Sequence, residues 1–472
     1  MANIHDIVEN TKNSNRNRWD KMSSKKGCIE EKTKGSFDMP KENFPANIIC
    51  LVRPKWKELH LSEHHMPKEF AKMGYVVIYV SFALDLAVSL KTLLRWKNPY
   101  PIKEWFKNLN LLKKPAQLKK NFFLARNVPL LLGFGFWGII DCFNERLMWW
   151  YLKRLARKLN MDEYVLYTAT YFPTKIEDKR CKLLVYDCGD DLSSMTSIPK
   201  RRLRLKDLES RMLKQADLFF AISRSLFSEK NKINPHGFYL PLCIDLNRFN
   251  LYKKNRAFKK SLEDLGRPLI GLLSAMSNQK IDWDVLLYVA VHRPDYKFIL
   301  AGPVAGKIPE ALVNLKNVFY LGPQKEENLP ILLGSFDVGL IPFNRNTFGN
   351  HAFPTKMPEY LCLGIPVVST DIPNLREYEG TIEIARDKKE FAEKIDKCLS
   401  QNHDKESFER RKQIARNFSK EKRAQQILKQ MEKIWGMKFT SNPEIRAKGL
   451  DFSNGHFPVE TKEGCKEGKN FL

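Results

Sequence analysis

The stretch HAFPTKMPEYLCLGIPVVST, residues 351–370, combines a helix start with a strand. Residues 358–364 are predicted to form a short helix closed by a glycine, and the apolar, β-branched run 365–370 is typical of a buried strand. A histidine, a threonine, a lysine and a glutamate surround the helix start, where exposed amides and the helix dipole favour an anion. The stretch therefore predicts a helix–strand unit with an anion site before the helix.

The same pattern continues on both sides of this stretch. From Ala46 onward, short β-rich runs alternate with amphipathic helical stretches, as in parallel sheets covered by helices. A first block of predicted strands comprises residues 47–52, 75–81, 163–168, 182–187, 218–223 and 238–242. A second block comprises residues 268–276, 297–302, 317–322, 338–343, 365–370 and 381–385. Two successive doubly wound units are the economical interpretation.

The length of 472 residues is too great for one ordinary core, and 43% hydrophobic residues are enough to bury two. We therefore expect an α/β fold with two Rossmann-like doubly wound domains facing a central cleft. The predicted divisions are a disordered polar tail at 1–45, an N-terminal domain at 46–250, a linker at 251–266, a C-terminal domain at 267–407, a helix at 408–437 that crosses back to the N-terminal domain, and a polar tail at 438–472. In such sheets ligands bind beyond the carboxyl ends of the strands. The loops expected to line the cleft from the C-terminal domain are 274–280, 302–306, 322–324 and 344–359.

The chain carries a formal charge of +26, from 80 Lys and Arg against 54 Asp and Glu, which attracts polyanions. Residues 91–126 hold ten basic side chains and one acidic one, and they predict contact with an anionic membrane surface, with solvated faces as the alternative. No nucleic-acid recognition motif with interleaved aromatic residues is present, so no specific nucleic acid is expected as a partner.

The nine cysteines are scattered without a CxxC pair, which fits a reducing cytoplasm better than a zinc or redox site. The N-terminus lacks the apolar core of a signal peptide. The most apolar segment, residues 128–140, has only thirteen residues, whereas a spanning helix needs about 20. We expect a cytoplasmic protein, peripheral on the inner face of the membrane.

The residues at the predicted helix start suit a nucleotide. Lys356 and Thr355 offer a cation and a hydroxyl to a phosphate oxygen. The carboxylate of Glu359 would repel phosphate but suits the two hydroxyls of a ribose. The alternative leaves Lys356 as a solvated surface lysine and Glu359 as a partner of the helix dipole, and spacing alone does not choose between them.

Several segments, taken in order, resemble GT-B glycosyltransferases. They include LLVYDCGDDLSS, SAMSNQKIDWDV, KFILAGPV and FPTKMPEYLCLGIPVVST, and the resemblance extends over most of the chain. It is closest to bacterial family 4-like transferases of cell-surface polysaccharides. The resemblance implies a hexosyltransferase with a nucleotide-sugar donor in the C-terminal domain and a saccharide or lipid-linked acceptor in the N-terminal domain. It implies no cofactor, because the nucleotide sugar is a substrate, and a metal-independent, retaining reaction.

The resemblance also implies site residues. The donor-binding candidates are Ser277, Lys280, Gly302, Gly322, Thr355, Lys356 and Glu359. The catalytic candidates are Lys356, His351 and Asp190. Many family 4 enzymes carry two glutamates eight positions apart, and here the first of these positions is His351, which puts the retaining course in doubt. A plain turn remains the alternative for Ser277 and Lys280, and a structural turn glycine for Gly302.

In the N-terminal domain, His64 and His65 follow the first predicted strand and are candidates for acceptor binding, with a helix-surface pair as the alternative. Asp187, Asp190 and Asp191 follow another strand at the same edge. One of these aspartates is expected to orient or deprotonate an acceptor hydroxyl, and another to cap the next helix.

Two other functions remain open. Because His351 stands in place of a glutamate, the protein could be a catalytically impaired nucleotide-sugar binder. Gly133, Gly135 and Gly138 match the GxGxxG pattern of a NAD-dependent oxidoreductase, but basic residues occupy the region about 20 positions on, where an acidic residue is required. An apolar loop of aromatic residues near a lipid-carrying acceptor, or simply a loop packed over the core, is the preferred interpretation of this segment.

Overall fold

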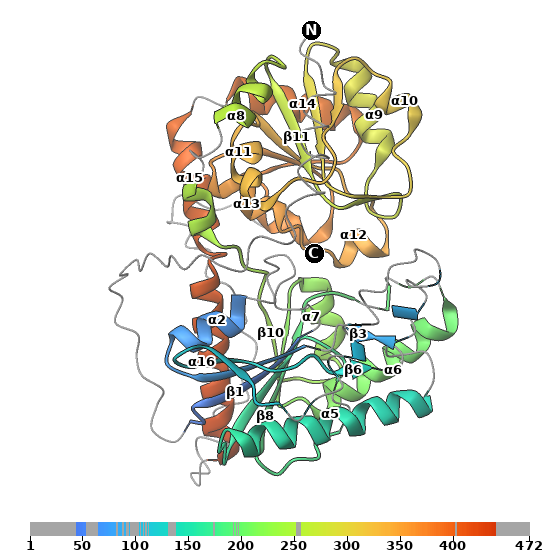
Figure 1. The fold of residues 1–472 in the computed structure, drawn as a ribbon. Helices are drawn as coiled ribbons and strands as arrows, with labels where there is room; N and C mark the ends of the chain where they lie inside the picture. The colour runs from blue at the N-terminus through green and yellow to red at the C-terminus, as the bar shows by residue number, and fades with distance from the viewer. Residues whose placement is uncertain are drawn as a thin grey trace, which may run out of the picture.

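The computed structural model has two lobes, one above the other in Figure 1. It describes residues 44–52, 65–81, 113–130, 138–172, 175–191, 198–251, 256–401 and 404–439, together with short pieces at 84–86, 89–90, 94, 103, 105–106, 108, 111, 193–194 and 196. The predicted polar tails fall almost wholly outside these residues.

The N-terminal lobe is built on an eight-stranded sheet of order β10-β9-β8-β7-β1-β2-β5-β4. Its strands are β1 (Asn47–Val52), β2 (Val76–Ser81), β4 (Ala116–Lys119), β5 (Phe122–Leu124), β7 (Tyr164–Thr168), β8 (Cys181–Cys188), β9 (Leu218–Ala221) and β10 (Gly237–Tyr239). Every pair is parallel except β4 with β5. All six strands predicted for this block are confirmed. Two short strands, β3 (Leu84–Asp85) and β6 (Pro129–Leu130), pair with each other outside the sheet.

Helices cover both faces of this sheet because successive strand residues point to opposite sides. Ile48 and Cys50 of β1 pack in one core, whereas Ile49 and Leu51 pack in the other. The helices of the lobe are α2 (His65–Lys72), α5 (Gly138–Lys158), α6 (Pro199–Gln215), α7 (Arg224–Asn231) and α16 (Lys420–Phe439). Figure 1 shows α16 passing down beside α2, and five of its residues complete the core on that face. These residues are Ala424, Ile427, Leu428, Met431 and Ile434.

The C-terminal lobe has a six-stranded, fully parallel sheet of order β15-β13-β11-β16-β17-β18. Its strands are β11 (Leu269–Leu273), β13 (Lys297–Ala301), β15 (Val318–Tyr320), β16 (Val338–Ile341), β17 (Val367–Thr370) and β18 (Glu383–Ala385). Numbered along the chain, the order is 3-2-1-4-5-6, that of a doubly wound nucleotide-binding sheet, with its switch point between β11 and β16. The predicted fold class is confirmed, including the six strands of this block.

Helices and short strands connect this second sheet. They are α8 (Arg256–Glu263), β12 (Met276–Ser277), α9 (Trp283–His292), β14 (Val304–Ala305), α10 (Glu310–Val313), α11 (Leu329–Gly334), α12 (Thr347–His351), α13 (Lys356–Cys362), α14 (Lys388–Ser400) and α15 (Lys405–Arg416). Short 3₁₀ helices occur at η2 (Leu246–Leu251), η3 (Glu326–Asn328) and η4 (Pro373–Tyr378). The helix predicted at 358–364 is α13, which begins two residues earlier, and Gly364 after it has a φ of +74°. The range predicted as a linker contains α8, which contacts α11.

The prediction of a single helix at 408–437 is wrong, because the segment forms two helices, α15 and α16. The chain leaves the helical conformation between α15 and α16. There, Phe418 is buried against the rings of Phe353 and Tyr378, at centroid distances of 5.7 and 5.8 Å. The next residue, Ser419, forms a parallel bridge with Ile244. α15 contacts α13 of the C-terminal lobe, whereas α16 contacts α2 of the N-terminal lobe.

The two chain segments that join the lobes therefore lie side by side. The amide of Ile244 donates to the carbonyl of Phe418 at 2.8 Å, and the amide of Lys420 donates to the carbonyl of Ile244 at 3.2 Å. The Lys420 ammonium lies 2.6 Å from Asp245. These contacts form a compact hinge at one edge of the molecule (Figure 1).

Candidate active site

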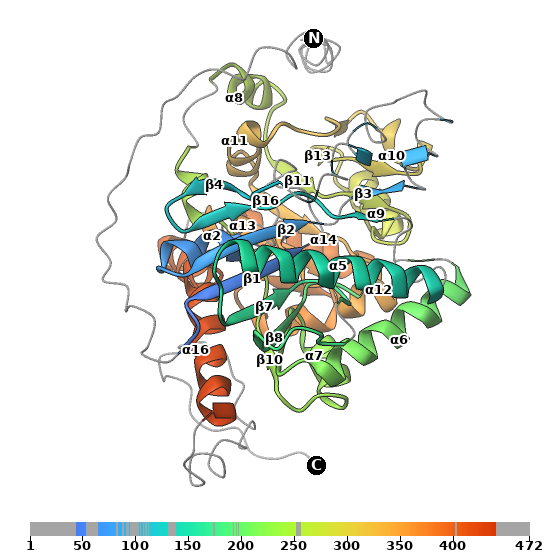
Figure 2. The same ribbon diagram turned by 60° about the horizontal axis from the view of Figure 1, so that its bottom comes forward.

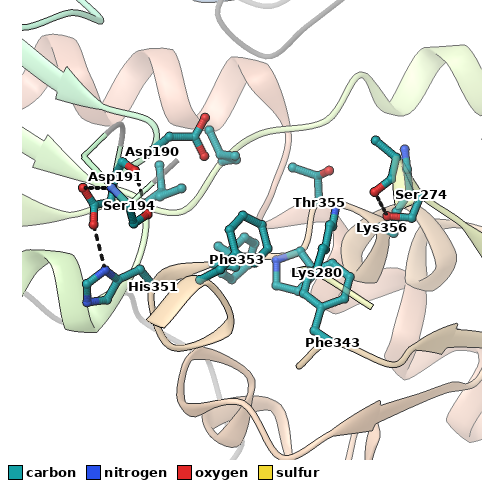
Figure 3. Close-up of a pocket in the computed structure, with 16 residues that line it drawn as sticks. Asp190, Asp191, Ser194, Ser274, Lys280, Phe343, His351, Phe353, Thr355 and Lys356 are labelled. Carbon is teal, nitrogen blue, oxygen red and sulfur yellow. Dashed lines mark hydrogen bonds and ion pairs between the residues drawn. The ribbon is translucent and has the colours of Figure 1, made fainter. Parts of the chain in front are cut away.

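A pocket of about 290 Å³ lies between the two lobes (Figure 3). Its N-terminal wall comes from the loops after β8, β9 and β10, and its C-terminal wall from the loops after β11 and β16. The N-terminal residues are Asp190, Asp191, Ser194, Ile222 and Leu242. The C-terminal residues are Ser274, Ala275, Lys280, Phe343, Phe348, His351, Ala352, Phe353, Pro354, Thr355 and Lys356. The pocket thus lies at the carboxyl ends of the strands, where the doubly wound topology places ligands.

Lys280 is held between aromatic rings on the C-terminal wall. Its ammonium lies 4.8 Å from the ring centroid of Phe343 and 6.0 Å from that of Phe348. Burial, helped by the charge of Lys356 and opposed by that of Asp190, lowers the pKa of Lys280 to about 8. The sequence pointed to Lys280 but not to the two phenylalanines, whose only signal was their position just beyond an apolar strand.

Lys356 is the first residue of α13 and lines the same wall as Lys280, with Thr355 beside it (Figure 3). Its ammonium lies 2.6 Å from the carboxylate of Glu359, one helical turn away. Glu359 is not among the lining residues, but this ion pair places it directly behind Lys356. Two lysines and a hydroxyl therefore converge on one side of the pocket, an arrangement suited to the oxygens of a diphosphate.

The other donor-binding candidates, Ser277, Gly302 and Gly322, are not among the residues that line this pocket. Ser277 lies in β12, which pairs with β14. Gly302 has a φ of +121°, and a Cβ atom there would lie 2.0 Å from the carbonyl oxygen of Ser274. The backbone alone therefore requires glycine at this position. Gly322 has a φ of +66° and open space around its missing Cβ. The loops after β13 and β15 supply no residue to the pocket lining, although Gly302 packs against Ser274, which does line it.

His351 ends α12 and contacts the N-terminal lobe across the pocket. Its Nδ1 lies 3.3 Å from Oδ2 of Asp191, and its Nε2 lies 3.8 Å from Oε2 of Glu229 on α7. Burial alone would raise the pKa of Asp191, but hydrogen bonds from His351 and Ser193 hold it well below its usual range. The sequence did not indicate this contact between lobes, because its partners are more than a hundred positions from the histidine.

The aspartates after β8 have three different environments. Asp190 lines the pocket on the wall opposite Lys280 (Figure 3). Asp191 accepts hydrogen bonds from the amide and hydroxyl of Ser193, at 3.0 and 2.6 Å, so it orders the turn after β8 and does not cap α6 as expected.

Asp187 is a structural residue and not an acceptor-site residue. Its buried carboxylate accepts two hydrogen bonds from Arg423 of α16, at 2.7 and 2.8 Å, and one from the hydroxyl of Tyr167. The same guanidinium donates to the carbonyls of Leu240 and Pro241 beside the hinge.

Of the two predicted acceptor histidines, His65 does not line the pocket. His65 is buried at the start of α2, on the face of the sheet that α16 covers, and His64 lies outside the described residues.

The glycine pattern does not have the context of a dinucleotide site. Gly133 and Gly135 lie outside the described residues, and Gly138 is the first residue of α5. The strand before it is β6, which pairs with β3 outside the main sheet, whereas the fingerprint follows a strand of the main sheet.

The described residues lack two other features, a group of metal ligands and a membrane-spanning helix. Their His, Cys, Asp and Glu side chains form no group of three or more that could hold a metal ion. Of the helices in these ranges, none is at once long enough and apolar enough to cross a bilayer.

Comparisons with known proteins agree with this architecture. Residues 267–401 match the family model described as glycosyl transferases group 1. A protein of Bacillus subtilis (strain 168) named for teichuronic acid biosynthesis, the glycosyltransferase TuaH, is 27% identical over 271 residues, which are 53% of this chain and 67% of that protein.

Solved structures share the fold at low sequence identity. Alr3699/HepE of Anabaena in complex with UDP has a TM-score of 0.55 and 17% identity, over 82% of this chain and 99% of that one. The sucrose-phosphate synthase of Thermosynechococcus elongatus has a TM-score of 0.60 and 12% identity, over 83% and 99%. Together with the two facing lobes and the pocket between them, these findings show the GT-B fold and a glycosyl transferase group 1 domain at residues 267–401, and they support a glycosyltransferase.

Proposed function

We propose that the protein transfers a hexose from a nucleoside-diphosphate sugar to a saccharide or lipid-linked acceptor in cell-surface polysaccharide synthesis, on the inner face of the membrane. One observation carries this proposal: two lysines on the C-terminal wall face aspartates of the N-terminal wall across a single pocket. The teichuronic acid name of the Bacillus relative supports the acceptor class. HepE structures with UDP and with UDP-glucose support a uridine nucleotide as donor.

In this proposal the donor diphosphate lies between Lys280 and Lys356, and Glu359 accepts hydrogen bonds from the ribose hydroxyls. The ion pair of Lys356 with Glu359 suits this arrangement, because a diphosphate and its ribose are adjacent groups. As the bond to the sugar breaks, negative charge grows on the leaving diphosphate. The two ammonium groups stabilise that charge more strongly in the transition state than in the bound donor, without need of a metal.

Asp190 is proposed to orient or deprotonate the acceptor hydroxyl, because it lines the N-terminal wall opposite the lysines. Closure of the lobes excludes water and so favours transfer over hydrolysis. His351, bound to Asp191, would hold the closed arrangement and offer a hydrogen bond to the donor sugar in place of the family's glutamate. Retention at the anomeric carbon is part of the proposal and needs product analysis.

A nucleotide-sugar binder with impaired catalysis is the second candidate, because a carboxylate of the N-terminal lobe already engages His351. The two candidates differ in donor turnover. A transferase releases nucleoside diphosphate slowly from its donor even without acceptor, and a pure binder does not. Chromatographic detection of released UDP therefore distinguishes them.

The test of the donor site is a thermal-shift screen of nucleoside diphosphates and nucleotide sugars. A ligand at 100 times its dissociation constant stabilises the folded protein by about 2.7 kcal/mol. We expect uridine nucleotides to raise Tm in the wild type and in Lys316→Ala, which removes an exposed lysine outside the pocket. The shift should be lost in a Lys280→Ala, Lys356→Ala double variant. An equal shift in that variant would place the nucleotide elsewhere.

The lowered pKa of Lys280 predicts a pH dependence. The ammonium is charged below about pH 8 and neutral above it, so diphosphate binding weakens as the pH rises through this value. We expect kcat/KM for the donor, which reports the free enzyme, to fall above about pH 8. Lys280→Arg keeps its charge at these pH values and should remove this decline. An unchanged profile in Lys280→Arg would assign the decline to another group.

A further inference from the structure

Helix α5 presents an unusual outer face. Its inner face is fully packed by residues such as Trp149, Leu152 and Leu155. The outer face carries large apolar residues at helical spacing: Ile139, Phe143 and Trp150 are 87%, 51% and 46% exposed. Side chains three and four positions apart share one face of a helix, so these three form a single apolar stripe.

Basic side chains accompany this stripe. Arg146 and Arg157 are exposed and continue the same helical spacing, and the guanidinium of Arg154 lies 6.0 Å from the centroid of the Trp150 ring. Ile, Phe and Trp interleaved with Arg form the pattern of a helix that lies in the interface of a membrane.

Helix α6 extends this surface. Its Arg204 binds Asp141 of α5 at 3.2 Å, and Figure 2 shows the two helices close together at one end and diverging from there. Leu203 of α6 is 70% exposed and Ile198, just before the helix, is 49% exposed. We call the outer sides of α5 and α6, with residues 139, 143, 146, 150, 157, 198 and 203, the α5–α6 face.

The charge of the α5–α6 face is positive. Residues 200–214 contain seven basic side chains and two acidic ones. Of the acidic ones, Glu209 is buried against Lys230 at 2.7 Å, and Asp207 is bound by Arg204 and Arg211 at 2.9 and 3.1 Å. Arg204 and Arg211 are used in neutralising Asp207, so the basic excess of this range comes from the other five residues, 200, 201, 202, 206 and 214. On the C-terminal lobe, by contrast, the exposed apolar residues Val291, Val313 and Phe408 stand on separate helices, α9, α10 and α15.

We propose that the α5–α6 face docks on an anionic lipid bilayer. This rests on the proposed function, because an enzyme acting on a membrane-borne acceptor needs its acceptor lobe at the membrane, and both helices belong to that lobe. The apolar stripe enters the boundary between head groups and acyl chains while the basic side chains bind anionic head groups. A protein partner on the same face is the competing occupant.

Co-sedimentation of the full chain with phosphatidylcholine vesicles, with and without phosphatidylglycerol, tests the docking. We expect binding only with phosphatidylglycerol and loss of binding at high salt. The Ile139→Ser, Phe143→Ser, Trp150→Ser variant should bind about 100-fold more weakly. The matched control, Val291→Ser with Val313→Ser, removes exposed apolar residues of the other lobe and should bind as the wild type does.

A second variant keeps the test decisive if the serine variant does not fold. Arg146→Glu with Arg157→Glu changes only exposed charges and should also lose binding to phosphatidylglycerol vesicles. Wild-type binding by this charge variant overturns the docking. So does a wild-type dimer in size-exclusion chromatography with light scattering that the charge variant dissociates, because the face would then bind protein. The UDP thermal shift is measured on every variant, so loss of vesicle binding with an intact shift is separated from failure of the donor site.

Discussion

We expect Lys356→Ala to lower kcat for sugar transfer by about 10²-fold, the usual effect of removing one group that stabilises transition-state charge. Lys356 begins α13 and lines the pocket beside Thr355, with its ammonium 2.6 Å from Glu359. The negative charge on a leaving diphosphate grows as the sugar departs. Removing the ammonium therefore destabilises the transition state more than it destabilises the bound donor. Steady-state kinetics with saturating donor and acceptor measure the effect.

The control for this variant is Lys316→Ala, which removes an exposed lysine outside the pocket and should keep kcat within about twofold, as expected of a surface change. Because Glu359 loses its partner in Lys356→Ala, circular dichroism and Tm are recorded as well. Normal turnover in a folded Lys356→Ala protein would remove this lysine from the mechanism.

Breaking the buried ion pair between Asp187 and Arg423 is expected to be the most destabilising single change. Both groups are buried, and the guanidinium also donates to the carbonyls of Leu240 and Pro241. Arg423→Ala leaves the Asp187 carboxylate buried without its counter-charge, which costs about 3–5 kcal/mol of unfolding free energy. Urea unfolding followed by fluorescence measures this loss.

Lys429→Ala is the matched control, because Lys429 lies on the same helix, α16, but is exposed. Its effect should stay within about 0.5 kcal/mol. Replacing both partners, as Asp187→Leu with Arg423→Leu, should recover part of the lost stability, since no charge then remains buried. Equal unfolding free energies for Arg423→Ala and Lys429→Ala would show that the ion pair does not anchor α16.

Most of the fold could be predicted because the strands are short apolar runs separated by helical stretches. The strands at 47–52 and 365–370 can be predicted from their own residues, because a strand that is buried on both faces is a continuous apolar run. The break between α15 and α16 could not be predicted in this way. Residues 417–419 include Asn and Ser, which are weak helix formers, and Ser419 caps α16 by accepting a hydrogen bond from the amide of Lys422 at 3.1 Å. These local signals alone do not fix a break, which the burial of Phe418 and the bridge from Ser419 to Ile244 complete.

The site was predictable where it depends on one strand and its loop. Lys280 and Lys356 follow strands of the second sheet, and the structure brings both to one pocket. Contacts between lobes were not predictable, because they depend on how two separately folded units face each other. Asp187 shows the same limit: it follows a strand beside Asp190, but its partner Arg423 is 236 positions away.

The position of α16 also sets the order in which the molecule can be completed during translation. The five core residues that α16 supplies to the N-terminal lobe are made after the whole C-terminal lobe, residues 256–416. On the ribosome, the lobe that emerges first therefore has one face of its sheet only partly covered, by α2, until α16 has been made. The lobe made second is the first to possess all of its parts, which reverses the usual order from the N-terminus onward.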